Sequence, residues 1–125
     1  MIDAYFRSVF SALRAPLIVE SHNITFDKRG PYAGYVRGEI FFVDGTQLYF
    51  REFVNTQAGV QRFTYVYHYS GTDDAMIFRY DDSPHFPDLP SFPHHKHLAD
   101  GISVVSSPAP TLTRVLAEIE TLIAA

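Results

Sequence analysis

The sequence predicts one α+β domain in which an antiparallel sheet of about five strands packs against an N-terminal and a C-terminal helix, with an ordered Pro/His-rich loop. Apolar residues recur at helical spacing near both ends of the chain. Between them, runs rich in Val, Ile, Thr, Tyr and Phe alternate with turn-forming residues. One pair of runs flanks an Asp-Gly dipeptide, which is typical of a β-hairpin. We expect residues 1–125 to form a single domain, because this length suits one core.

The composition is that of a soluble globular protein. Hydrophobic residues make up 46% of the chain, and no apolar run reaches the length of a membrane span. The first residues lack the basic start and apolar segment of a secretion signal, so we expect a cytoplasmic protein without a membrane partner. Cysteine is absent, which excludes disulfides, thiolate metal sites and a cysteine nucleophile. The net charge of -4 restricts any contact with nucleic acid to a local patch.

The first predicted elements are a helix and a strand. The helix is amphipathic and ends before Pro16, because proline does not continue a helix. Residues 17–26 are rich in Ile, Val and Thr and predict the first strand, which the Lys28-Arg29-Gly30-Pro31 turn ends. The apolar stripe of the helix consists of Ile2, Tyr5, Phe6, Val9 and Leu13.

A hairpin follows, with strands at residues 35–43 and 46–54 on either side of Asp44-Gly45. If this loop has two residues, Val43 faces Thr46 and Arg37 faces Glu52 across the strands. We interpret the latter two as an exposed ion pair that fixes the register and contributes little to stability.

The next predicted strand, residues 62–69, carries a row of alternating aromatic residues. Its tyrosines either stack on nucleotide bases or form a sheet face covered by a helix, and the second interpretation is the commoner one. His68 in this strand is interpreted as a half-buried packing residue. Residues 75–80 form the last long strand, whose end carries Arg79 and Asp81 into the loop.

The C-terminal part contains a second predicted helix. Residues 101–106 can add a short edge strand, and Pro108-Ala109-Pro110 predicts that the helix begins just after it. The apolar side chains that keep helical spacing and predict a face packed on the sheet are Leu112, Val115, Leu116, Ile119, Leu122 and Ile123.

In the loop between the predicted strands at residues 75–80 and 101–106, proline recurs at every third residue. Pro84, Pro87, Pro90 and Pro93 match the repeat of a polyproline II helix, which predicts an ordered, extended segment with one apolar edge docked on the domain. In such a segment His85 and His94 are separated by roughly 28 Å, too far to bind one metal ion together.

Three interpretations of the histidines remain open. In the first, His94 and His97 bind a metal ion together with an acidic residue such as Asp81, in a segment curled into a turn. In the second, the histidines only bind backbone groups and hold the loop on the sheet. In the third, they catalyse metal-independent RNA cleavage without a cofactor. Two histidines would then transfer protons, while Arg79 and Lys96 stabilise the phosphate and Asp81 orients the base. The candidate catalytic residues are Arg79, Asp81, His85, His94, His95, Lys96 and His97.

The chain resembles the TumE-type family of small proteins over nearly its whole length. The most specific matching block is Phe92-Pro93-His94-His95-Lys96-His97, and the chain departs from the family pattern at Asp82, Ser83 and Phe86. Other matching segments are Phe50-Arg51-Glu52-Phe53, Tyr65-Val66-Tyr67-His68-Tyr69, Phe78-Arg79-Tyr80-Asp81 and Val115-Leu116-Ala117-Glu118-Ile119-Glu120. The resemblance implies the toxin component of a bacterial toxin-antitoxin system, with a helix-turn-helix antitoxin as partner, and implies no catalytic residue.

Two functions therefore stand as hypotheses. The protein is either a toxin that cleaves RNA with its His/Lys/Arg site, or a non-enzymatic effector that binds a protein target. Metal binding by the histidine-rich loop is a further alternative. Small sheet domains of this kind often pair with a copy of themselves, so a homodimer is also a prediction.

Overall fold

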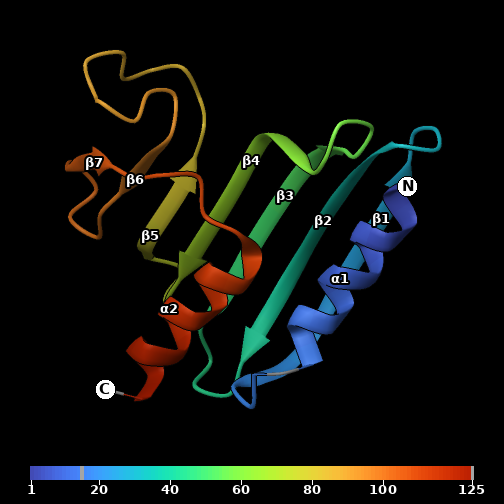
Figure 1. Ribbon diagram of the computed structural model, residues 1–125. Helices are drawn as coiled ribbons and strands as arrows, with labels where there is room; N and C mark the ends of the chain where they lie inside the picture. The colour runs from blue at the N-terminus through green and yellow to red at the C-terminus, as the bar shows by residue number, and fades with distance from the viewer. Residues whose placement is uncertain (15, 125) are drawn as a thin grey trace.

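The computed structural model describes residues 1–14 and 16–124, and within them it has two helices and one antiparallel sheet of seven strands (Figure 1). The helices are α1 (Ile2–Arg14) and α2 (Leu112–Ala124). The strands are β1 (Val19–Lys28), β2 (Ala33–Phe42), β3 (Gln47–Asn55), β4 (Gln61–Ser70), β5 (Met76–Asp81), β6 (His95–His97) and β7 (Val104–Ser106).

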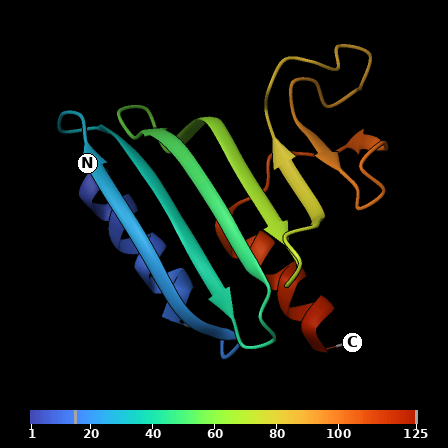
Figure 2. The same ribbon diagram turned by 180° about the vertical axis from the view of Figure 1, so that it is seen from behind.

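The sheet is a meander in which every strand pairs with its neighbour in the sequence. Both helices lie on the same face of this sheet (Figure 1), and Figure 2 shows the opposite face with no helix of the described residues over it. We call these the inner and the outer face. The α+β class and the two terminal helices are confirmed, whereas the expectation of about five strands is too low. The strand missing from the prediction is β6, because His-Lys-His has no β-forming pattern.

The core lies between the inner face and the helices. Side chains alternate between faces along a strand, so every second residue of β2 and β3 is buried there. The helices contribute Val9 and Leu13 from α1 and Val115, Leu116 and Ile119 from α2. Tyr65, Tyr67 and Tyr69 of β4 join this core with at most 2% of their surface exposed, which confirms the packing interpretation and excludes stacking on bases.

The hairpin between β2 and β3 differs from the prediction by one residue. Its loop has three residues, since the Phe42 amide donates to the Thr46 carbonyl (2.9 Å) and Gly45 takes a φ of 87° that favours glycine. The register therefore places Arg51, not Glu52, opposite Arg37. The predicted Arg37 and Glu52 ion pair is wrong, because one extra loop residue turns Glu52 to the inner face.

Glu52 is a buried carboxylate, 1% exposed, beneath α1. It accepts hydrogen bonds from the hydroxyls of Tyr5 and Tyr67, and Arg62 Nη1 lies 3.9 Å away. Burial, followed by the charge of Glu52, raises the pKa of both phenols, which keeps them protonated as donors. This network joins α1, β3 and β4 in one polar cluster within the core.

The proline-rich loop is a series of turns and not a polyproline II helix. Amides donate three residues back, from Leu89 to Phe86 (3.2 Å) and from Phe92 to Leu89 (3.0 Å), whereas a polyproline II helix has no internal hydrogen bonds. Phe86 and Leu89 are half-buried while Phe92 is 44% exposed, so only part of the predicted apolar edge packs on the domain. Turns let the chain reverse, which brings β6 back beside β5.

Candidate functional site

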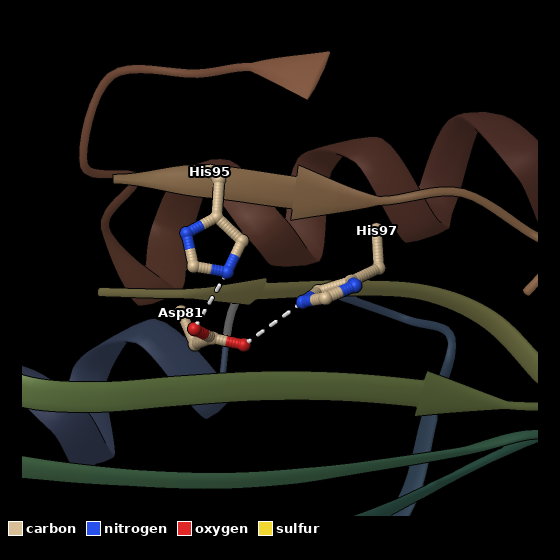
Figure 3. A group of neighbouring side chains, drawn as sticks. All are labelled: Asp81, His95 and His97. Atoms are coloured by element: carbon tan, nitrogen blue, oxygen red, sulfur yellow. Dashed lines mark ion pairs between the residues drawn. The ribbon is translucent and has the colours of Figure 1, made fainter. Parts of the chain in front are cut away.

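The candidate site lies on the outer face where β5 pairs with β6. Register places Asp81 opposite His95 and Arg79 opposite His97. Residues two apart in a strand point to the same face, so all four side chains share one side of the sheet. Figure 3 shows both imidazoles of β6 directed at the Asp81 carboxylate on the neighbouring strand.

Asp81 and the two histidines form a compact group. The Nε2 atom of His95 lies 2.8 Å from Asp81 Oδ1, and His97 Nε2 lies 3.3 Å from Asp81 Oδ2. Asp81 is 3% and His95 is 1% exposed, whereas the side chain of His97 is 28% exposed. The group is thus closed on the His95 side and open to solvent at His97.

The Asp81 carboxylate is held in place by two donors. The Ser83 amide donates to Oδ1 (3.0 Å), and Arg79 Nε donates to Oδ2 (3.1 Å). Burial raises the pKa of Asp81, but the Ser83 amide and the Arg79 guanidinium outweigh it and leave the pKa below its usual value. Asp81 is therefore an ionised, oriented carboxylate.

The ring of His95 is oriented by the backbone. Its Nδ1 lies 2.9 Å from the carbonyl oxygen of Pro93, which can only accept, so Nδ1 carries a proton and donates it. The Nε2 atom is buried and has no hydrogen-bond partner among the described residues, although it lies beside Asp81. Buried polar atoms without a partner are uncommon in folded proteins, so this nitrogen requires a physical reason.

His68 extends the group along the outer face. It pairs with Arg79 in register, and its Nδ1 lies 3.5 Å from Arg79 Nη1. Burial and then the charge of Arg79 lower the pKa of His68, and burial also lowers the pKa of His97. Sequence reasoning treated His68 as a packing residue, because its place beside Arg79 depends on the register of β4 with β5.

Three of the residues predicted for the site lie elsewhere. Lys96 points to the inner face, where its Nζ binds Glu118 Oε2 of α2 at 2.7 Å. His94 stacks on Tyr65 and binds its hydroxyl through Nδ1 at 2.9 Å. His85 is exposed in the loop. The structure therefore brings together Arg79, Asp81, His95 and His97 and separates Lys96, His94 and His85 from them.

Part of the loop covers the site. The Phe86 ring lies 4.8 Å from the ring of His95 and 5.8 Å from that of His97, edge-on to both. This contact removes His95 from solvent. The sequence analysis singled out Phe86 only as a departure from the family pattern, and no sequence signal predicted its contact with His95 and His97.

The outer face also carries two adjacent arginines, Arg37 and Arg51, and we call the line of paired residues that leads from them to the site the arginine row. Arg37, Arg51 and Val66 pair in successive strands, and Val66 pairs in turn with Asp81. Arg37 and Arg51 are exposed and line one groove together with Tyr35 and Tyr49. Neither arginine makes a salt bridge among the described residues. The same groove is lined by Asp27 and Arg29, which pair with each other, so the surface combines an excess of positive charge with aromatic rings.

A protein family described as Toxin TumE matches residues 9–123, nearly the whole chain. No significant match was found among curated proteins, and none among solved structures. Across the described residues, neither helix is long and apolar enough to span a membrane.

Proposed function

Because this chain belongs to the Toxin TumE family, we propose that it is the toxin of a toxin-antitoxin pair and that it stops growth by cleaving RNA in the cytoplasm. Membership of a toxin family implies an antitoxin partner. We further propose that this partner is a helix-turn-helix protein. The single observation that carries the RNA assignment is the continuity of the arginine row with the Asp81 group on one face of the sheet.

The outer face has the chemistry that single-stranded nucleic acid requires. Arginines bind phosphates, and exposed aromatic rings stack on bases without regard to sequence. Tyr35 is 43%, Tyr49 39% and Phe63 44% exposed on this face. The overall charge of -4 does not oppose such binding, because Arg37 and Arg51 concentrate positive charge in one place.

At the end of this surface, Arg79 and the Asp81 group supply the chemistry. In RNA cleavage the ribose 2′-hydroxyl oxygen forms a bond to phosphorus, the bond from phosphorus to the leaving 5′ oxygen breaks, and a proton passes from the attacking to the leaving oxygen. Negative charge develops on the phosphate. Arg79 is held by Asp81 through Nε, and its side chain is 36% exposed, so its terminal nitrogens can bind that phosphate. His97 is more exposed than His95, so its ring can contact an incoming substrate.

Induced expression in a bacterial host tests this proposal. We expect growth arrest and fragmented RNA with the unaltered chain, and neither with Arg79→Ala. His85→Ala is the matched control, because His85 lies in the adjoining loop outside the site, and it should behave like the unaltered chain. Growth arrest with intact RNA would instead support the alternative that the toxin acts by binding a protein target.

A further inference from the structure

We propose that Asp81, His95 and His97 bind one divalent first-row transition-metal ion such as Zn²⁺. Two imidazoles and one carboxylate are a ligand set suited to this class of ion. One ligand atom from each residue can be chosen so that all three lie within 4.8 Å of one another. Donors on the same ion, each bonded at about 2.1 Å, lie at most about 4.2 Å apart, so a small movement of the partly exposed His97 ring completes the set.

The buried His95 nitrogen is the observation that points to a cation. A proton on Nε2 would point outward in the plane of the imidazole ring. Asp81 Oδ1, 2.8 Å from Nε2, does not lie in that direction and forms no hydrogen bond with it. An unprotonated Nε2 would place its lone pair beside a carboxylate and meet no donor. A metal ion would satisfy both groups. It accepts the in-plane lone pair of Nε2 and at the same time binds Asp81 Oδ1, which lies to the side of that lone pair.

The surroundings of the ligands match those of metal centres. A histidine that binds metal usually donates its other ring N–H to a backbone carbonyl or a carboxylate, and His95 Nδ1 does so to Pro93. Asp81 is itself hydrogen-bonded by Ser83 and Arg79, each through one oxygen, which leaves a second lone pair on both oxygens. The ring contact of Phe86 closes the buried side of the group.

The proposed centre has three protein ligands and opens toward solvent at His97. Catalytic zinc sites have this form, with a fourth position for water or substrate, whereas structural sites are closed by four ligands. A divalent ion and Arg79 together outweigh the single charge of the Asp81 carboxylate and leave a net positive charge that suits an anionic phosphate. This last step depends on the proposed RNA cleavage, but the binding of the metal does not.

Direct binding measurements test the site. We expect isothermal titration calorimetry of the tag-free, metal-stripped protein with Zn²⁺ to give one ion per chain. His97→Ala should weaken Zn²⁺ binding by more than about 100-fold. Losing a group that only hydrogen-bonds to a metal ligand already costs up to about 100-fold in affinity, and losing the ligand itself costs more. His85→Ala should bind as the unaltered chain does. Co²⁺ as a spectroscopic probe should give visible absorption bands that His97→Ala removes.

Absence of Zn²⁺ binding, or equal binding by the unaltered chain and His97→Ala, would overturn the metal site. Circular dichroism must show that the unaltered chain and the His97→Ala protein are both folded, which makes these results decisive. RNA cleavage measured separately with EDTA distinguishes the two proposals. Cleavage that persists in EDTA refutes a catalytic metal and supports the metal-independent mechanism, while tight Zn²⁺ binding without cleavage keeps the site and refutes the ribonuclease.

Discussion

At the scale of single residues, Glu52 shows how one loop residue decides the environment of a side chain. The strands on both sides of the Asp44-Gly45 turn were predictable from their residue types, but the loop length was not. A loop of three residues shifts the register by one and moves Glu52 from the surface into the core. The sequence contains no separate signal for a buried carboxylate, because its partners Tyr5, Tyr67 and Arg62 come from three other segments.

We predict that Glu52→Ala lowers the free energy of unfolding by about 3 kcal/mol, because it leaves two phenols without their acceptor and Arg62 without its nearby negative charge. Glu52→Gln should cost less, since its amide oxygen still accepts a hydrogen bond. Urea unfolding measures both. The control Glu39→Gln, exposed on the outer face, should change stability by less than about 0.5 kcal/mol. A neutral effect of Glu52→Ala would contradict the network.

At the scale of elements, β6 divides the His94-His95-Lys96-His97 block between the two faces of the sheet. The sequence marked this block as the functional part, and the resemblance to a family marked the same residues. The sequence did not reveal that His95, Lys96 and His97 form a strand, because turns in the preceding loop replace the extended conformation that the proline period suggests. Alternation along β6 then sends Lys96 to α2 and both neighbouring histidines to Asp81.

This division predicts that adjacent substitutions in β6 have different effects. Lys96→Ala removes a partly buried contact with Glu118 on the inner face and should cost at most about 1 kcal/mol while growth arrest persists. His97→Ala, one residue further, should abolish growth arrest with little change in stability. Thermal unfolding and growth after induction measure the two effects. Loss of toxicity in a fully folded Lys96→Ala protein would place Lys96 in the functional site.

At the scale of the whole molecule, the two helices leave one face of the sheet open (Figure 2), and the residues of the candidate site lie on that face. The helices at the two ends of the chain were predictable from their apolar periodicity. That they cover the same face was not, because a meander allows each helix to cross over either side. The row formed by Arg37 and Arg51 depends on the hairpin register, so a shift of one residue in the predicted register concealed it.

From the open face we predict that the protein binds single-stranded RNA through Arg37 and Arg51. The double variant Arg37→Gln/Arg51→Gln should bind an oligoribonucleotide more weakly and show a smaller salt dependence, with the slope of log K against log salt reduced by about 1.4 for two phosphates. Fluorescence anisotropy over a range of salt concentrations measures this slope. The control Arg7→Gln/Arg14→Gln removes the same charge from α1 on the other side of the sheet. Equal losses in both variants would show that only net charge matters.

The meander also sets the order in which the molecule becomes complete during synthesis. Each strand needs only the preceding one as a partner, so the sheet can grow in the direction in which the ribosome delivers the chain. Asp81 and the histidines of β6 are separated by the whole proline-rich loop, and they meet only after residue 97 has emerged. A ribosome-bound chain therefore has most of its sheet before Asp81, His95 and His97 can meet, and we expect a product truncated within the loop to be inactive as a toxin.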